Sequence, residues 1–466
     1  MSTFTITISS DGETMNPAYR VASLDVSKAV DRMPDATIAL LDGSPASREF
    51  PLSDSDFFAP GKPVEIALRY EGGEDTQVFT GLVVRNGLRI DAGQPLLLVE
   101  LRDAAIVLTH PRRCQAFRDM TDSDVFSQLV SDAGLETGQV DSTEPAHAEL
   151  IQYRVSDWDF LVSRAQAFGL CVVVDNGVLS LRAADLSAAA DHHLELGIDE
   201  LFDLELEADA LGQAAGIDAS AWDPANQQTT EPVSAAEFTL AQGDLTPASV
   251  VEALGFTASS LAHTVSLDPD ELQGWADGSL RRNRLTMMRG RIGLRGRTDL
   301  APFQLVELAG VANRFTGKAL ITGVRHRVDD GGWRTDIELG LDPRRLAGQS
   351  DLAELPAGGL LPAVPGLQIG VVGVFEADPD GEQRMRVLLP VLGEDPGAVW
   401  ARLAMPHAGT EHGFVFRPET GDEVIVGFLD GDPRQAVILG ALYSSANAPA
   451  GDYAEASEEN NDKGIV

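Results

Sequence analysis

Apolar and polar positions alternate with a period of two along much of the first 110 residues. Residues 4–8, 64–68 and 79–84 show this alternation, which places successive side chains on opposite faces of a strand. Residues 96–101 are apolar at nearly every position, as expected for a strand buried on both faces. Gly, Pro and Asp separate these runs. The pattern predicts a small β-barrel or sandwich.

Two short helices are predicted after residue 120, where the apolar residues recur at helical spacing. Thr121 is the expected N-cap of the first helix, and Gly134 marks its end. Ser156 and Gly169 bound the second helix in the same way. Acidic residues follow both caps, where the helix dipole favours negative charge. The expected apolar faces are Val125, Phe126, Leu129 and Val130 in the first helix, and Phe160, Leu161, Ala165 and Phe168 in the second.

The middle of the chain is less regular. Residues 171–182 predict a hairpin that turns at Asp-Asn-Gly, a strong short hairpin signal. Residues 186–280 are acidic and rich in Ala, with one helix predicted near 247–254. A second β region is predicted from about 290 to 341, and the Pro- and Gly-rich residues 348–365 predict a semi-rigid linker.

The last hundred residues predict a compact barrel. Short apolar, β-branched runs are separated by turn residues such as those at 378–381 and 430–434. Five strands at this spacing are typical of an OB-type barrel. The predicted strands are 370–375, 384–389, 413–416, 422–428 and 436–439.

An OB barrel alone would suggest oligonucleotide binding, but the charge of the chain argues against that function. The chain has 35 basic and 72 acidic residues and a formal net charge of −37. Such a charge repels phosphate backbones, so nucleic acid is excluded as an expected partner. The acidity has two open interpretations: solubility or a salty habitat, and acidic faces that line a lumen or guide assembly.

The sequence offers no catalytic motif. It lacks GxSxG, HExxH and GxxxxGK[ST] patterns, and its eight histidines are scattered. His407 and His412 flank a barrel loop, which we interpret as structural. Cys114 and Cys171 are expected to be buried free thiols. We therefore expect no enzyme activity, no catalytic residue, no metal site and no cofactor.

One basic stretch stands out in this acidic chain. It could be a solvated strand-and-helix face, or it could pair with carboxylates of a neighbouring subunit, since Arg binds them bidentately. Candidate intersubunit contacts are Arg289, Arg291, Arg295, Phe414 and Phe416, although Phe414, Phe416, Phe428 and Trp400 could equally belong to the core. The basic stretch consists of Arg281, Arg282, Arg284, Arg289, Arg291, Arg295 and Arg297.

Two passages resemble a known family. The segment PHAGTEHGFVFRPETGDEVIVGFLDGDPRQAVILGALY, residues 406–443, resembles the spike-base domain of VgrG proteins and related contractile-injection-system spikes. Residues 310–328 and 333–340 resemble the second of two hub barrels in VgrG and phage baseplate-hub proteins. The resemblance implies a mainly β fold with an α+β hub: two hub β-barrels with helices, then a five-stranded OB-fold barrel.

Six segments follow from the patterns and the resemblance together. A first hub barrel is expected over 1–115, a helical and hairpin region over 116–215, and a second hub barrel region over 216–345. A linker over 346–365 leads to an OB-fold spike base over 366–445. Residues 446–466 are expected to begin a C-terminal needle. That needle is missing, either because the chain is truncated, which we favour, or because this member has a short spike.

The resemblance implies a trimeric central spike of a contractile injection apparatus, in type VI secretion, a tailocin or a phage tail-like particle. It would join a sixfold inner tube to a threefold membrane-piercing tip and help deliver cargo. Expected partners are the inner tube protein, baseplate components, a PAAR-type tip protein and effector cargo. With no signal peptide expected at the N-terminus, assembly is expected in the bacterial cytoplasm, followed by outward propulsion. The alternatives are a phage tail hub with cell-wall hydrolase activity and an OB-type binding module.

Overall fold

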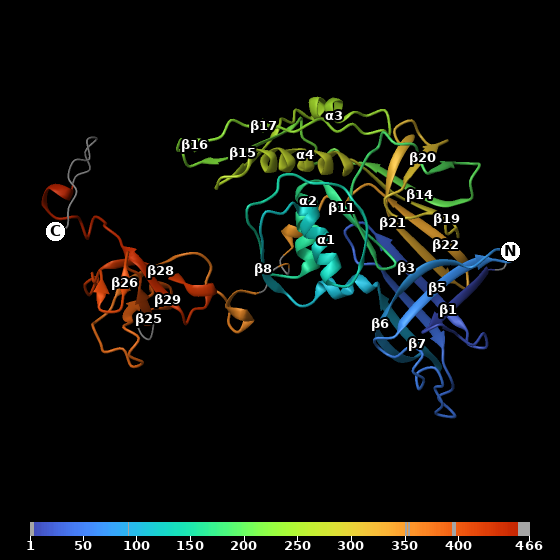
Figure 1. Ribbon diagram of the computed structural model, residues 1–466, viewed down its shortest axis with the longest axis horizontal. Helices are drawn as coiled ribbons and strands as arrows, with labels where there is room; N and C mark the ends of the chain where they lie inside the picture. Colours follow the sequence, from blue (N-terminus) through green and yellow to red (C-terminus); the bar gives the residue numbers. More distant parts are fainter. Residues whose placement is uncertain (1–3, 92, 350–351, 353–354, 394–397, 455–466) are drawn as a thin grey trace. The chain divides into compact units, whose positions relative to one another are not determined.

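The computed structural model describes residues 4–91, 93–349, 352, 355–393 and 398–454 (Figure 1). The chain divides into two compact units, Met1–Leu352 and Ala353–Val466. We call the first unit the hub and the second the barrel unit. Of the predicted needle start, residues 455–466 lie outside the described part, as do residues 350–351 and 353–354 of the predicted linker.

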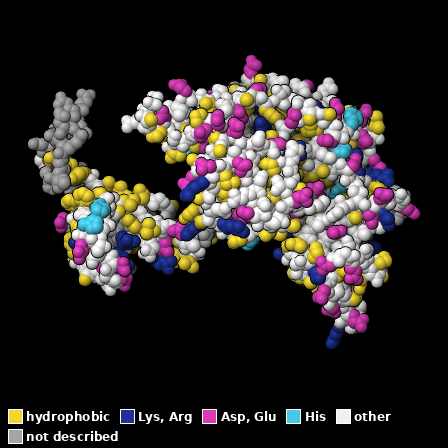
Figure 2. Space-filling model, in the orientation of Figure 1, with side chains coloured by type: hydrophobic (Ala, Val, Ile, Leu, Met, Phe, Trp, Pro, Cys, Tyr) yellow, Lys and Arg dark blue, Asp and Glu magenta, His cyan; other side chains and the backbone are white. Residues whose placement is uncertain are grey.

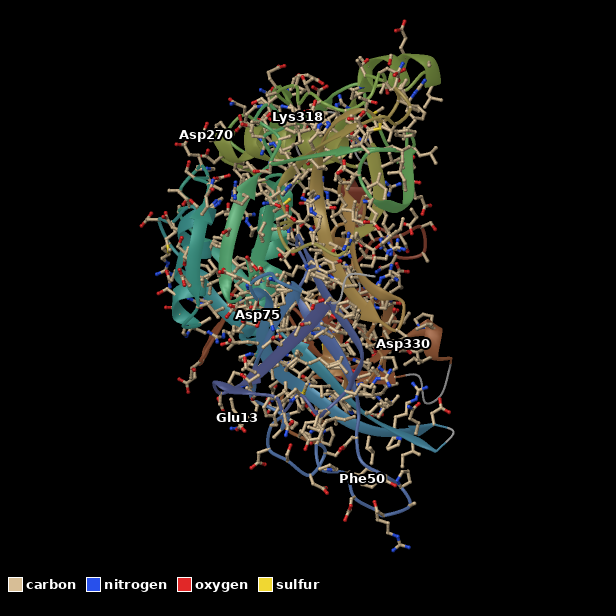
Figure 3. All side chains as sticks on the ribbon, turned by 90° about the vertical axis from the view of Figure 1, so that its right-hand side faces the viewer. Glu13, Phe50, Asp75, Asp270, Lys318 and Asp330 are labelled. Atoms are coloured by element: carbon tan, nitrogen blue, oxygen red, sulfur yellow. The ribbon has the colours of Figure 1, made fainter. Side chains whose placement is uncertain are left out.

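The hub is built on one 13-stranded sheet. Figure 3 shows β21 extending from the region of Lys318 toward the turn at Asp330. The main path runs in the order β14 (Leu201–Ala208), β19 (Met288–Arg295), β22 (Gly332–Leu339), β21 (Gly317–Asp329), β3 (Val21–Ala29), β4 (Asp35–Leu41), β7 (Gln94–Arg102), β6 (Thr76–Asp91), β5 (Pro63–Tyr70), β1 (Phe4–Ser10) and β2 (Glu13–Thr14), with β20 (Leu305–Ala309) on β21 and β13 (His192–Glu195) on β20.

The two β regions of the sequence meet at β3 and β21, which pair antiparallel with His326 opposite Val26. Each half has its own apolar core: Phe79 lies in the N-terminal one and Ile292 in the other. Trp333 comes from the second half but packs in the first core. The predicted mainly β class with a helical hub and an OB-type barrel is confirmed, and the two hub halves share one sheet.

The two predicted helices are α1 (Asp122–Asp132) and α2 (Asp157–Ala167). Thr121 caps α1 through a capping box with Asp124, and Ser156 caps α2. Both pack with a three-stranded sheet that contains the predicted hairpin. That sheet consists of β9 (Glu136–Val140), β11 (Leu170–Asp175) and β12 (Val178–Ala183), and a separate two-stranded sheet of β8 (Arg113–Phe117) and β10 (Leu150–Val155) lies beside it.

The longest helix, α4 (Pro269–Leu285), is not among the predicted elements. It contains Gly274 and Gly278, which lower helix propensity. A Cβ on Gly278 would lie 2.2 Å from the carbonyl carbon of Phe168, so α4 packs against the end of α2 only because this position is Gly. The predicted α3 (Pro247–Leu254) is confirmed. Short strands surround these helices: β15 (Ile217–Asp223), β16 (Gln228–Thr229), β17 (Val233–Ser234) and β18 (Ser259–His263).

The barrel unit contains a closed five-stranded barrel, as predicted. Val387, Val424 and Ile438 are fully buried in its core. The strands close in the order β23 (Gln368–Val372), β24 (Met385–Leu388), β25 (Ala398–Leu403), β29 (Ala436–Ala441) and β28 (Glu423–Phe428), and a small hairpin of β26 (Ala408–Gly409) and β27 (His412–Gly413) lies outside the barrel.

One predicted barrel strand was wrong. The third strand is β25 (Ala398–Leu403), whereas of 413–416 only Gly413 lies in a strand. Gly413 has a φ of +139° and belongs to the small hairpin, and the backbone N–H of Phe414 donates to the carbonyl of His407 at 2.9 Å. The apolar run in 413–416 therefore does not face the core. Short 3-10 helices complete the fold: Ala104–Thr109, Leu346–Gly348, Pro356–Gly359, Pro390–Leu392, Leu429–Gly431 and Gly451–Ala454.

Candidate assembly surfaces

The three candidate arginines Arg289, Arg291 and Arg295 lie at alternate positions of β19 and therefore on one face of the sheet. Arg289 Nη2 lies 2.7 Å from Asp209 and 2.8 Å from Glu207. Arg291 and Arg295 also contact carboxylates of the same chain, Asp336 at 2.9 Å and Glu200 at 3.3 Å. The basic stretch was interpreted either as a solvated strand-and-helix face or as a contact between subunits. The structure shows these three arginines paired with carboxylates of their own chain, and a role between subunits stays a prediction.

Asp336 is the centre of this ion-pair network. It is 2% exposed and binds Arg291, Arg327 and Arg334 at distances of 2.6–2.9 Å. Burial acts to raise the pKa of Asp336, but hydrogen bonds from Arg334, Arg291 and Arg327 outweigh burial and hold that pKa below its usual value. Asp336 therefore stays ionised and fixes three guanidinium groups on the face of the sheet.

The other members of the basic stretch also interact within the chain. Arg282 and Arg284 are almost fully buried: Arg282 lies 3.4 Å from Asp31, and Arg284 donates to the carbonyl of Ala214 at 2.8 Å. Arg281 lies over the ring of Phe238, and Arg297 pairs with Asp299. The structure thus brings only Arg289, Arg291 and Arg295 together on a partly exposed face.

This charged face continues across the sheet. Arg295 on β19 and Arg85 on β6 stand at the two ends of a row of residues that lie directly opposite one another on neighbouring strands. Because directly opposite residues point to the same face of a sheet, Arg295 and Arg85 lie on the same face. The opposite face of β14 carries Leu204 and Leu206, which pack on the second core. Intervening members of the charged face are Arg334, Arg327, Asp25, Thr37 and Glu100, and Asp203, Glu205 and Glu207 extend it onto β14.

Two open strand edges of the large hub sheet are long enough to pair with another strand. Strand β14 (Leu201–Ala208) pairs only with β19. Strand β6 (Thr76–Asp91) continues past its pairing with β5, and its last eight residues, 84–91, pair only with β7. Val84, Leu88 and Ile90 on this segment are about half exposed. Such edges present unpaired backbone groups to a further strand.

The barrel unit has an apolar outer surface as well. Ile369 on β23 lies opposite Ile425 on β28, on the side away from the core residue Val424. Leu367 and Leu439 stand on either side of Gly427, where an added Cβ would meet both at about van der Waals distance. Ile369, Leu367 and Leu439 are half-exposed or more. The outer surface of the barrel is therefore apolar and exposed at these positions.

Phe414 and Phe416 are surface residues. Their side chains are 49% and 56% exposed, and their rings stack 6.1 Å apart. Phe428 packs partly on the barrel core, and Trp400 lies under the guanidinium groups of Arg384 and Arg386. Of the four aromatic candidates, only Phe414 and Phe416 remain available to a partner.

A buried ion cluster connects three helices of the hub. Asp122 binds His147 at 2.9 Å and Arg164 at 2.6 Å, and Arg164 lies 3.3 Å from Glu271 on α4. Burial acts to raise the pKa of Asp122, but the hydrogen bonds from His147 and Arg164 outweigh it and hold the pKa below its usual value. The cluster fixes α4 against α1 and α2.

Within the described ranges, no group of three or more His, Cys, Asp and Glu side chains is arranged to hold a metal ion. The rings of His407 and His412 lie 5.0 Å apart. A Cβ on Gly409 would lie 2.5 Å from His412 Nε2, so that nitrogen faces the hairpin backbone. Cys114 and Cys171 are both free thiols, as expected, but Cys114 is exposed rather than buried. No helix of the described chain has the length and apolar content to cross a membrane.

Sequence reasoning missed a second basic surface. Arg112 and Arg118 flank β8 and are exposed, and Arg113 lies between them. Figure 2 shows Lys and Arg side chains grouped in this part of the hub surface. The signal was present in residues 110–118, HPRRCQAFR, which hold three Arg and no acidic residue.

Comparisons with known proteins agree with this architecture. A family model described as the Alg8 N-terminal domain matches residues 1–330, and one described as the type VI secretion system/phage-baseplate injector OB domain matches residues 368–443. The type VI secretion system spike protein VgrG1c of Pseudomonas aeruginosa is 25% identical over 413 residues, which cover 83% of this chain and 55% of that protein. The chain therefore spans about half the length of this relative.

Two further similarities are more local or more distant. The spike protein VgrG5 of the same organism is 37% identical over 93 residues, which cover 18% of this chain and 12% of that protein. The crystal structure of a 43 kDa tail protein of prophage MuSo2 from Shewanella oneidensis superposes with a TM-score of 0.53 at 14% identity, covering 72% of this chain and 98% of that one. At this identity the superposition shows a shared fold and no more.

Proposed function

Since this chain belongs to the Alg8 N-terminal domain family and is a VgrG-like spike and hub protein of the type VI secretion and phage-baseplate class, we propose that three copies assemble into the central spike of a contractile injection apparatus. The assembly would join a sixfold inner tube to a threefold tip. Each hub has two halves with separate apolar cores, so three hubs would provide six modules, which is the number that a sixfold tube needs.

The observation that carries the proposal is the match between the two open edges of the hub. When residues 84–91 of one copy run antiparallel to β14 of the next, a register that places Arg89 opposite Asp203 also places Arg85 opposite Glu207. Opposite charges across neighbouring strands stabilise their pairing by roughly 0.2–1 kcal/mol each. Arg85 and Glu207 also have partners within the chain, Glu100 and Arg289, so edge pairing in this register would extend existing ion pairs across the joined sheet.

The same register matches the apolar faces. It places Leu88 opposite Leu204, and both point to the side of the sheet that carries the hub cores. The apolar face of one copy therefore continues into that of the next, as does the charged face. Because the two edges differ, the contact is head-to-tail, and such contacts close into rings when the rotation allows.

The barrel unit offers a second surface for contact between copies. It exposes Leu367 and Leu439 beside Gly427, and Ile369 on β23, and exposed apolar patches can mark interaction sites. In a trimer these side chains would pack on neighbouring barrels. Arg289, Arg291 and Arg295 of the hub and Phe414 and Phe416 of the barrel unit remain part of the proposal as contacts between subunits.

The remaining roles rest on family resemblance. The inner tube protein and baseplate components would contact the hub, and a PAAR-type tip and effector cargo would be carried on the spike. The assembly would form in the bacterial cytoplasm and pierce a target membrane when it is driven outward. The protein would act mechanically, without catalysis of its own.

The test is the solution mass by multi-angle light scattering, compared with the chain mass of 49.6 kDa. We expect the wild type to have three times this mass. Arg85→Glu and Glu207→Arg should each lower it through repulsion at every interface, and the double variant should restore it. Arg289 retains Asp209 as a partner when Glu207 is replaced, so the fold is expected to persist and circular dichroism checks it.

Arg20→Glu serves as the matched control, because Arg20 is 70% exposed in its side chain and lies outside both edges. A wild type that stays monomeric at all concentrations would refute the trimer. A trimer that neither Arg85→Glu nor Glu207→Arg affects would refute the proposed pairing but leave the trimer standing.

A further inference from the structure

The two-stranded sheet of β8 and β10 presents an unusual surface for so acidic a protein. Ile151 and Tyr153 of β10 are 57% and 65% exposed. Ala116 of β8 lies directly opposite Ile151, and Cys114 follows on the same outward face. The inward residues Phe117 and Leu150 pack on the helical core. The outward face is therefore apolar and exposed.

Arginines frame this apolar face. Arg112 and Arg118 stand immediately before and after β8, at positions that alternate with Cys114 and Ala116, and both are exposed. The guanidinium of Arg154 lies 5.7 Å from the centre of the Tyr153 ring. The surface thus offers positive charge at both ends of one strand and apolar side chains between them.

Arg118 differs from the arginines at 281–297 in how its charge is used. There, Arg284 is buried and Arg289 is held by two carboxylates of the same chain. At β8, Arg118 is 73% exposed in its side chain, and its partner Glu149 is itself half exposed at 3.3 Å. A solvated pair of this kind contributes little to stability, so a ligand can replace Glu149 at small cost.

Both strands also have open edges. Within the described chain, β8 and β10 pair only with each other. Each edge offers backbone donors and acceptors that a further strand can use. Strand addition of this kind takes its affinity from the backbone and its specificity from alternate side chains.

We propose that the β8–β10 sheet is a docking site for an extended, acidic segment of another protein. The segment adds as a strand next to β8 and carries carboxylates six residues apart, opposite Arg112 and Arg118. At about 3.3 Å per residue these positions lie about 20 Å apart along the strand. Small apolar side chains of the segment fill the alternate positions between them, against Cys114 and Ala116.

The overall charge of −37 does not prevent this contact. Charges are screened over about 8 Å at physiological ionic strength, so the ligand responds mainly to the arginines beside it. A nucleic acid or an anionic membrane would extend well beyond the sheet and meet the acidic surface around it. Only a polypeptide also completes the open strand edges, which is why we favour one.

The experiment measures fluorescence anisotropy of a labelled peptide, acetyl-ETVTVTE-amide, on the whole chain. Its two Glu residues match the spacing of Arg112 and Arg118. Two control peptides carry Lys in place of Glu, or Pro in place of each Thr. We expect binding of the first peptide alone, because Pro removes the backbone donors and Lys repels the arginines.

Variants locate the site. Arg118→Glu should weaken binding about tenfold or more, and Ile151→Thr should weaken it by a smaller factor. Arg344→Glu makes the same charge change at a residue whose side chain is 83% exposed elsewhere in the hub, and it should leave binding unchanged. None of these positions belongs to the proposed trimer edges, so light scattering on the same samples keeps the two proposals separate.

Equal binding of the Glu and Lys peptides would overturn the proposal, as would equal effects of Arg118→Glu and Arg344→Glu. Co-sedimentation with vesicles of phosphatidylcholine and phosphatidylserine, in the absence of peptide binding, would assign the surface to a membrane instead.

Discussion

The carboxylate of Asp336 lies 2.9 Å from the guanidinium of Arg291, diagonally across two neighbouring strands. Asp336 is nearly inaccessible to solvent, while the arginines around it remain about a quarter to a half exposed. One buried carboxylate thus neutralises part of a cluster that would otherwise repel itself, and the charged face of the hub depends on it.

Asp336→Asn should destabilise the hub by about 3–5 kcal/mol, because three guanidinium groups lose their shared anion. The lowered pKa of Asp336 decides how the stability of the hub changes with pH. The Asp336 carboxylate stabilises the folded state fully above about pH 4, the ordinary pKa of an unfolded carboxylate. This stabilisation is lost as the pH falls through the lower pKa that Asp336 has in the folded state. Urea unfolding of wild type and variant at neutral pH and near pH 3 measures this, and the difference between them should shrink at low pH.

Asp330→Asn is the control, since the side chain of Asp330 is 93% exposed. It should change stability by less than about 0.5 kcal/mol. A similar result for the Asp336 variant would show that the network contributes nothing.

The burial of His326 leads us to predict a second effect of pH on the stability of the hub. The side chain is 5% exposed and bonds Thr335 at 3.0 Å, and burial lowers the pKa of His326 to about 4. The unfolded chain takes up a proton near pH 6.5, so the unfolded state binds more protons and stability falls between about pH 6.5 and pH 4. Over that range the loss attributable to His326 is on the order of 3 kcal/mol.

His326→Gln should retain a hydrogen bond to Thr335 and remove this part of the pH dependence. Thermal unfolding at pH 7 and pH 4.5 compares it with wild type and with His193→Gln, a surface control. If the melting temperatures of wild type and His326→Gln fall by the same amount, the histidine does not control the loss.

Substitutions at Phe414 and Phe416 test whether these two rings lie at the surface or in the barrel core. Because both are half exposed, the double change to Ser should alter barrel stability by less than about 1 kcal/mol, and it should weaken trimer assembly if these rings contact a neighbour. Ile438→Ala, at a fully buried position, should cost about 2–5 kcal/mol. Unfolding curves and light scattering on the full chain separate the two effects; a large loss of stability from the Ser changes would place the rings in the core.

Local signals predicted much of the fold. Thr121 and Ser156 cap their helices, since a side-chain oxygen next to a free backbone N–H needs no distant partner. The Asp-Asn-Gly turn formed its hairpin for the same reason. The prediction of a strand at 413–416 was wrong because apolar composition does not tell whether a pairing partner exists.

The amino-acid sequence by itself determined the features whose causes are local: alternating strands, capped helices, tight turns, and a strongly acidic net charge. Only the tertiary structure decided what depends on distant neighbours. Gly278 permits α4 because Phe168 lies against it, and Arg284 is buried while Arg118 is exposed, although both belong to basic runs. Which face of a strand meets solvent, and which edge remains open, follows from packing between residues far apart in the chain, and a linear pattern does not record that packing.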